Sequence, residues 1–115
     1  MKLYKWDDID KEQLNPLMVR QVIHGQKMTV ARIHLSKGLV VPAHHHVNEQ
    51  ISMVERGKLR FNVDGREVLL QAGQTIAFEP DVSHGVEALE DSVALDVFSP
   101  PREDWQRGDD AYLRK

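Results

Sequence analysis

Short runs rich in β-branched and aromatic residues recur through the middle of this chain, each followed by a turn signal. Helical periodicity is hard to find along the same stretch. Eight short strands without crossover helices in a chain of 115 residues favour a sandwich, barrel or jelly roll, so the sequence predicts an all-β fold. The predicted strands are residues 18–24, 28–35, 50–55, 58–63, 66–70, 75–78, 85–89 and 93–98.

Turn residues separate these runs from one another. Asp64-Gly65 stands between residues 58–63 and 66–70, and it predicts a two-residue hairpin because a type I′ turn needs positive φ at both central positions. Pro100-Pro101 ends the last run, since proline cannot donate a hydrogen bond to a neighbouring strand. Further turns are expected at Gly25, Gly38, Gly57 and Gly73.

Length, composition and charge narrow the class of protein. The 115 residues suit one domain, 1–115, and leave no room for a second core. The net charge of −3 argues against nucleic acid or anionic lipid as a partner. With no leader peptide evident and no apolar stretch of membrane-spanning length, we expect no membrane partner and a cytoplasmic location. Because cysteine is absent, any metal ion must be bound through nitrogen and oxygen.

The two ends of the chain are more polar than its middle. The C-terminal tail, residues 99–115, carries three apolar side chains that are expected to dock it on the β-domain or on a second subunit: Trp105, Tyr112 and Leu113. β-Domains of this size often pair through an edge strand or a sheet face, so we predict a homodimer. The N-terminal residues that offer such a surface are Met18, Val19 and Ile23.

Histidines gather at His44-His45-His46. In an extended chain residues two apart point to one face, which predicts that His44, His46 and Gln50 share a side while His45 faces away. His84, 38 residues downstream, can enter from an adjacent strand. Metal ligation needs several side chains that converge on one point, and these residues are candidates. The structural alternative is that a His-x-His pair recurs by chance and that His84 belongs to a turn.

The spacing of these residues resembles the first sequence motif of the cupin superfamily. That motif runs from a glycine through five residues to His-x-His, then three or four residues to a glutamate, and six residues to a second glycine. Here Gly38, His44, His46 and Gly57 match it in type and spacing, and Gln50 stands at the glutamate position.

The second cupin motif is matched less fully. It runs from a glycine to a histidine eleven residues later, as Gly73 and His84 do. Its proline comes one place late in this chain, at Pro80, whereas Asp81 and Ala88 replace a glycine and a terminal asparagine. The three histidines are retained, but the departures leave the fourth ligand open.

This resemblance implies a single-domain cupin, a jelly-roll barrel also called a double-stranded β-helix, with its motifs within residues 38–88. It implies one divalent metal ion, zinc, nickel, iron or similar, whose ligands would be His44, His46, Gln50 and His84. Glu49 is the alternative to Gln50, since a bulge would turn it toward the histidines.

The segment Asp96-Val97-Phe98-Ser99-Pro100-Pro101-Arg102, together with Gln50-Ile51-Ser52, resembles the KdgF-type cupins of pectin and alginate catabolism. Those proteins convert the ring form of 4,5-unsaturated uronates, released by polysaccharide lyases, into the open-chain keto acid. The resemblance therefore implies a metal-dependent ring-opening enzyme whose partner is a small unsaturated uronate.

Each residue of that segment has an expected role. Asp96 would shuttle a proton from the anomeric hydroxyl to the ring carbon. Arg102 would pair with the substrate carboxylate through two hydrogen bonds, with Phe98 over the sugar and Ser52 as a further contact. Each residue also has a structural alternative. Asp96 would pair with Arg32 or with Arg60. Arg102 would lie in a charged surface tail, and Phe98 would pack in the core.

Two other functions fit a metal-binding cupin. One is a non-catalytic module that senses a sugar acid, although this chain has no helix-turn-helix segment with which to read DNA. The other is a metal-dependent dioxygenase, which the neutral side chain of Gln50 disfavours because an anionic ligand stabilises oxidised iron.

Overall fold

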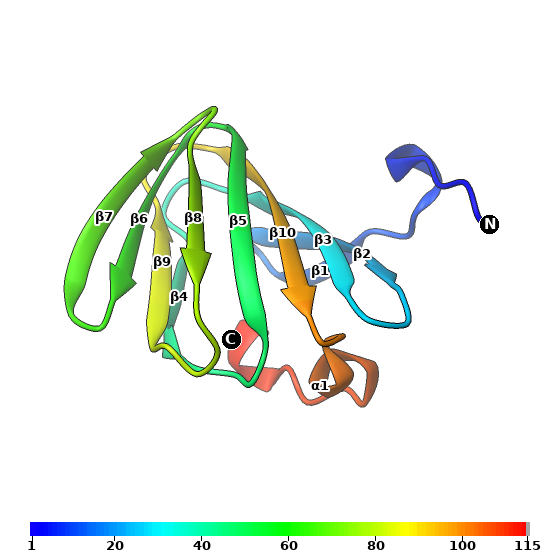
Figure 1. Ribbon diagram of the computed structural model, residues 1–115. Helices are drawn as coiled ribbons and strands as arrows, with labels where there is room; N and C mark the ends of the chain where they lie inside the picture. The colour runs from blue at the N-terminus through cyan, green and yellow to red at the C-terminus, as the bar shows by residue number, and fades with distance from the viewer. Residues whose placement is uncertain (115) are drawn as a thin grey trace.

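A computed structural model describes residues 1–114 of the chain, in which two antiparallel β-sheets face each other (Figure 1). The strands are β1 (Glu12–Asn15), β2 (Met18–His24), β3 (Thr29–Leu35), β4 (Val40–His44), β5 (Glu49–Arg56), β6 (Lys58–Val63), β7 (Arg66–Gln71), β8 (Thr75–Phe78), β9 (His84–Ala88) and β10 (Ser92–Ser99). Helical turns are η1 (Trp6–Asp8), α1 (Glu103–Gln106) and η2 (Ala111–Leu113). No helix within these 114 residues is both long enough and apolar enough to span a membrane.

One sheet has six strands in the order β1-β2-β3-β10-β5-β8, and the other has four in the order β4-β9-β6-β7. From β3 onward the chain passes repeatedly from one sheet to the other, so most pairings join segments far apart in sequence. The all-β prediction is confirmed, and the two facing sheets form the expected jelly roll.

Side chains alternate between the space inside the two sheets and the outer surface. Along β3, Ala31 and Ile33 are buried, whereas Arg32 between them is half-buried on the other face. By the same alternation, Asp96 and Phe98 of β10 face inward, each beside an inward-facing residue of β3. This alternation brings polar side chains to the wall of the core, where the candidate site lies.

The β6–β7 hairpin has the predicted turn. Val63 pairs with Arg66, and the two residues between them, Asp64 and Gly65, have φ of 49° and 83°. Gly57, which joins β5 to β6, also has positive φ, and a Cβ there would collide with the start of β10. Local turn chemistry thus sets the register of the β6–β7 hairpin and the sharp change of sheet between β5 and β6.

Two strands were missed from the sequence, β1 and β4. Both lie at sheet edges, where strands are short and tolerate residues that interrupt a ladder. Pro42 lies within β4 for this reason, since an edge strand can dispense with one N–H donor.

The C-terminal tail covers one end of the two sheets, below β5 and β10 in Figure 1. Leu113 joins the main hydrophobic cluster, and Trp105 and Tyr112 pack against it. The side-chain amide of Asn48 donates to the main-chain oxygens of Pro100 and Pro101, which fixes the corner after β10. The tail therefore forms one wall of the interior space that the sheets enclose.

Candidate metal centre

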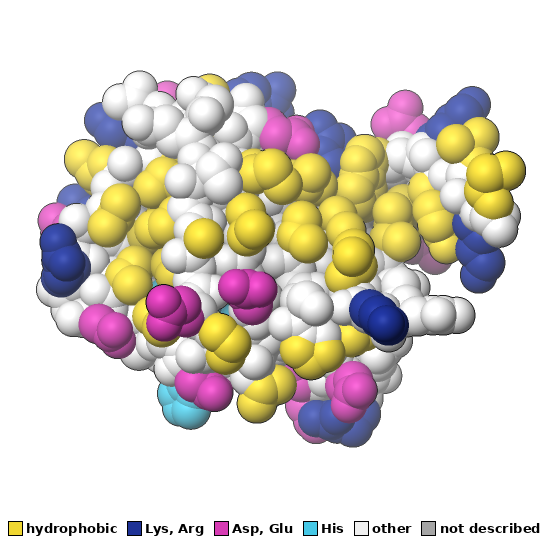
Figure 2. Space-filling view, in the orientation of Figure 1, with side chains coloured by type: hydrophobic (Ala, Val, Ile, Leu, Met, Phe, Trp, Pro, Cys, Tyr) yellow, Lys and Arg dark blue, Asp and Glu magenta, His cyan; other side chains and the backbone are white. Residues whose placement is uncertain are grey.

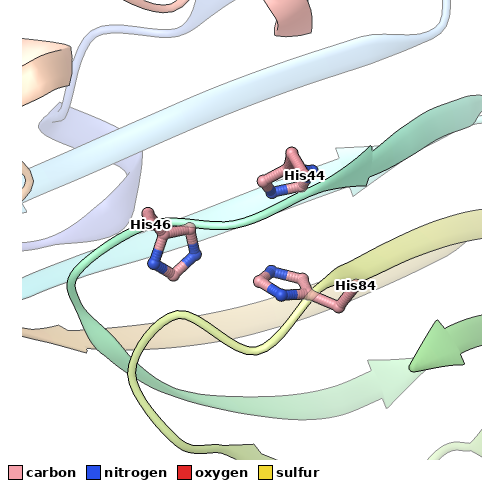
Figure 3. Close-up of side chains that lie close together, drawn as sticks. All are labelled: His44, His46 and His84. Atoms are coloured by element: carbon pink, nitrogen blue, oxygen red, sulfur yellow. The ribbon is translucent and has the colours of Figure 1, made fainter. Parts of the chain in front are cut away.

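Three histidines converge at the end of the sheets that the tail covers (Figure 3). One ring nitrogen from each of His44, His46 and His84 lies within 4.8 Å of the others. His44 ends β4 and His84 begins β9, where the two are cross-strand partners. His45 points elsewhere, with a side chain that is 71% exposed.

The reason for this convergence differs from the one expected. The sequence predicted that His44, His46 and Gln50 share one face of an extended chain. β4 ends at His44, however, because the chain must cross from the four-stranded to the six-stranded sheet before β5 begins at Glu49. His46 lies in this crossing, so the curve of the connection brings it back toward His44.

Main-chain carbonyl groups orient all three rings. In each ring Nδ1 lies at hydrogen-bonding distance from the carbonyl oxygen of a residue two positions away, so Nδ1 carries the proton of the neutral imidazole. The Nε2 lone pairs are then available to a metal ion, the arrangement that carbonyl partners commonly impose on ligand histidines. The pairs are His44 with Pro42 at 2.9 Å, His46 with Asn48 at 3.1 Å and His84 with Val82 at 2.8 Å.

The histidines are held in the neutral form that a metal requires. Burial, together with the positive charge of Arg102, lowers the pKa of His44 and of His46 to about 4. Burial also lowers the pKa of His84. At neutral pH no proton competes with a metal ion for these nitrogens.

Gln50 directs its amide oxygen at the same point. Its Oε1 lies 2.9 Å from Nε2 of His46, while its Nε2 donates to Oγ of Ser52 at 2.9 Å. Nδ1 of His46 already holds the ring proton, so two lone pairs face each other across this short distance. A cation between the two atoms relieves that repulsion, which supports the fit of a metal ion to these residues. The neighbouring Glu49 is exposed on the outer face of β5.

Asp96 lines the same cavity from β10. Its Oδ1 is buried and makes no hydrogen bond within residues 1–114. Burial raises the pKa of Asp96 to about 6, although the Ser52 hydroxyl and the charge of Arg102 oppose the rise. A carboxyl group with this pKa exchanges protons readily near neutral pH. The arginines considered as alternative partners pair elsewhere, Arg32 with Glu55 and Arg60 with Glu87.

Arg102 is 1% exposed, so the alternative of a surface tail residue is wrong. Its guanidinium lies over the ring of Phe98 at 4.7 Å and over that of Trp105 at 4.2 Å. Its Nε and Nη2 atoms donate to the two carboxylate oxygens of Asp104, at 3.0 and 2.9 Å. The expected pair of hydrogen bonds to a substrate is therefore already made within the chain.

Phe98 and Ser52, which were both expected to contact the substrate, are almost fully buried. Phe98 is 2% exposed and packs against the rings of His46 and Trp105, so it belongs to the core as well as to the cavity wall. Ser52 is 1% exposed beneath Gln50, which makes it a partner of that amide. Its predicted contact with substrate gains no support, because the side chain of Gln50 stands over it.

No sequence signal marks the two polar groups beside Arg102. Asp104 is one of several acidic residues in the tail, and nothing in the pattern separates it from Glu103. Tyr112 was considered only as an apolar anchor, yet its hydroxyl accepts a hydrogen bond from Arg102 Nη2 at 2.7 Å. Its ring lies 4.7 Å from that of His44.

The cavity has a volume of about 60 Å³ and is partly open to solvent. Its walls combine apolar side chains of both sheets with the polar groups just described. The polar residues that line it are His44, Gln50, His84, Asp96, Arg102 and Tyr112.

The arrangement matches a known domain family, since residues 31–99 match the cupin domain. This chain belongs to the cupin family. Over 102 residues this cupin is 29% identical to the pectin degradation protein KdgF of Dickeya dadantii, and the alignment covers 86% of this chain and 93% of that protein. The resemblance to KdgF-type cupins is thereby confirmed.

Solved structures agree with this assignment. The structure of KdgF from Halomonas sp. superposes on this cupin with a TM-score of 0.85 and 27% identity, covering 90% of this chain and 99% of that one. An RmlC-like cupin from Shewanella frigidimarina superposes with a TM-score of 0.86 and 28% identity, covering 91% of this chain and 96% of that one. The similarity extends over nearly the whole chain, well beyond the cupin motifs.

Proposed function

We propose that this cupin opens the ring of 4,5-unsaturated uronate monosaccharides, the products of pectin or alginate lyases, to give the linear keto acid. The observation that carries the proposal is a carboxyl group with a buried, unpaired oxygen, Asp96, in one cavity with His44 and His84 of the three convergent histidines. The similarity to KdgF over most of the chain supports the same reaction.

The residues that would hold the metal ion are His44, His46 and His84, with Gln50 as the proposed fourth ligand. When bound, a divalent ion would supply a Lewis acid that stabilises negative charge on the sugar oxygens. All four ligands are neutral and Arg102 adds a positive charge nearby, so the site favours a substrate that brings its own negative charge. A uronate carboxylate meets that requirement.

Asp96 carries the proton steps of the proposed reaction. Its ionised carboxylate takes the proton of the anomeric hydroxyl, and the C1–O bond to the ring oxygen breaks as the aldehyde forms. The ring oxygen leaves as the enolate of the C4–C5 double bond. Asp96 then returns the proton to C4, which gives the ketone at C5. Atoms balance without any net oxidation, so one carboxyl group with a pKa near 6 suffices.

A ring-opening assay tests this proposal. Metal-loaded protein is mixed with unsaturated uronate monomers from exhaustive lyase digestion, and loss of the enol-ether absorbance is followed together with proton NMR. We expect acceleration over the spontaneous reaction, lost in His46→Ala and kept in the matched control His45→Ala, whose side chain is exposed. No acceleration by metal-loaded, folded wild type would refute the reaction. Binding of the uronate without turnover would favour the sensor module.

We also propose that two copies of this cupin pair through the outer face of the six-stranded sheet. Figure 2 shows hydrophobic side chains in rows over β5, β10, β3 and β2. Strand registers join the residues of one such row across the sheet. They are Ile23, Val30, Val97, Ile51 and Ala77.

A second copy fits this surface because the N-terminal segment offers matching chemistry. Leu3 and Tyr4 are 91% and 48% exposed, and the N-terminal segment that carries them extends away from the sheets in Figure 1. In a pair related by a two-fold axis along the strands, this segment would reach the β5–β8 side of its partner. There Lys2 and Lys5 of the segment would lie near acidic residues at the edge of the partner's sheet. The acidic residues are Glu49 and Glu79.

The structure removes one residue from the surface that was predicted to form the dimer. Met18 is buried inside the sheets, because the alternation along β2 turns it inward, whereas Val19 and Ile23 remain on the outer face. Light scattering at micromolar concentration should give a dimer mass for wild type and a monomer mass for Ile51→Lys. Leu69→Lys, an equally exposed change on β7 of the other sheet, should stay dimeric. A monomeric wild type would refute the pairing.

A further inference from the structure

Arg102 is held so firmly that it cannot swing toward a ligand. Its guanidinium packs over the rings of both Phe98 and Trp105, which contact each other edge to face, and its side chain is 2% exposed. The main-chain N–H of Arg102 donates to the hydroxyl of Thr29 at 2.9 Å, which fixes the backbone as well. A ligand must therefore approach the guanidinium from the one side that faces the cavity.

Asp104 occupies two of the three nitrogens of that guanidinium. Nε and Nη2 donate to its carboxylate, which leaves Nη1 without a hydrogen bond among residues 1–114. Nη2 donates in addition to the oxygen of Tyr112. Because that phenol oxygen accepts from Arg102, its own proton is directed elsewhere.

Tyr112 lies at the cavity wall, where its phenol proton is available to a ligand. Its ring lies beside the ring of His44 and lines the cavity with Asp96 and Arg102. The phenol O–H and Arg102 Nη1 are thus two unused donors at the same wall. Two donors on one side of a cavity match the two oxygens of a carboxylate.

We propose that the phenol hydroxyl of Tyr112 binds the substrate carboxylate together with Nη1 of Arg102, while Asp104 stays paired and positions the arginine. The inference rests on the proposed function for its substrate class, the uronates. It replaces the expectation that both carboxylate oxygens are taken by Arg102 alone. It also makes Tyr112 a specificity-determining residue that separates sugar acids from neutral sugars.

Binding of a saturated sugar acid tests this without the reaction. Galacturonate and neutral galactose are titrated into zinc-loaded protein by calorimetry. We expect wild type to bind galacturonate more tightly than galactose. Tyr112→Phe keeps the ring beside His44 and should weaken galacturonate binding about tenfold, the effect of one hydrogen bond to a charged group, with galactose unchanged. In the ring-opening assay the same variant should raise KM about tenfold with kcat within about twofold.

Asp104→Asn tests whether Asp104 positions Arg102 or competes with the substrate carboxylate for it. If Asp104 stays paired, its loss frees Arg102 and weakens galacturonate binding. If the substrate must displace Asp104, the same variant tightens binding, which would overturn the inference. Glu103→Gln is the matched control, an exposed carboxylate-to-amide change in the same turn that should bind as wild type does.

Two further results would overturn the inference: no preference of wild type for galacturonate over galactose, or equal binding by wild type and Tyr112→Phe. Failure of the proposed function looks different. In that case galacturonate binds in a Tyr112-dependent manner, yet no ring opening of unsaturated uronates occurs. The carboxylate site would then stand alone as the site of a sugar-acid sensor.

Discussion

Replacement of Asp96 by asparagine removes a buried carboxylate at almost constant size. The pKa of this group is 3.8 as a free side chain, and burial raises it to about 6 in the folded protein. Between these values the folded state binds more protons than the unfolded state, so the free energy of unfolding falls as the pH rises. Below about pH 4 the carboxyl group is protonated in both the folded and the unfolded state, so it does not lower the free energy of unfolding.

Above about pH 6 the folded protein must hold the charged form. A rise from 3.8 to about 6 corresponds to about 3 kcal/mol, at 1.36 kcal/mol for each pKa unit. The asparagine variant lacks this cost, because its amide is neutral at every pH. Metal-free Asp96→Asn should therefore unfold like wild type at pH 4 and be more stable by up to about 3 kcal/mol at pH 8.

Urea unfolding of the metal-free proteins measures this difference, with tryptophan fluorescence as the probe and points between pH 4 and pH 8. Asp64→Asn is the matched control, since it changes an exposed carboxylate in the β6–β7 turn and asparagine tolerates the positive φ there. A gain in stability that does not vary with pH would refute the reasoning. So would a loss at pH 8, which would mean that the carboxylate is stabilised by a partner.

Three other predictions concern the metal centre and the fold. His46→Ala should lose metal in a competition assay with a chromophoric chelator, while His45→Ala retains it, because only His46 faces the other two histidines. Gln50→Ala should weaken metal affinity about tenfold or more, and Glu49→Ala should leave it unchanged; the reverse order would make Glu49 the ligand. Gly57→Ala should lower the midpoint of thermal unfolding by several degrees, because a Cβ at residue 57 collides with the start of β10 and alanine is strained at the positive φ of this residue. An unchanged midpoint would contradict the clash.

Much of the fold was predictable because its signals are local. Runs of β-branched and aromatic residues separated by turn signals located eight of the ten strands, and Asp64-Gly65 predicted a hairpin whose φ angles the structure bears out. The cupin family was predictable from spacing alone, since the glycines and histidines of this chain stand at the intervals of the two cupin motifs. The edge strands β1 and β4 escaped detection because β1 has a single apolar residue, Leu14, and Pro42 interrupts β4.

The composition of the candidate site was only partly predictable. The sequence identified three histidines, Gln50 and Asp96 as candidates. The structure brings four of them to one cavity and places His46 against its histidines and Gln50. The prediction that His44, His46 and Gln50 share one face of a single extended segment was wrong, because the chain changes sheets after His44.

By itself, then, the sequence determined which residue types are available and which local turns and strands they form, because these depend on neighbours along the chain. Only the tertiary structure decided that Gln50 faces inward and Glu49 outward, and that Asp104 and Tyr112 surround Arg102. Such contacts depend on how two sheets and a tail pack across the core. That packing joins residues far apart in sequence, and no periodicity or motif records it.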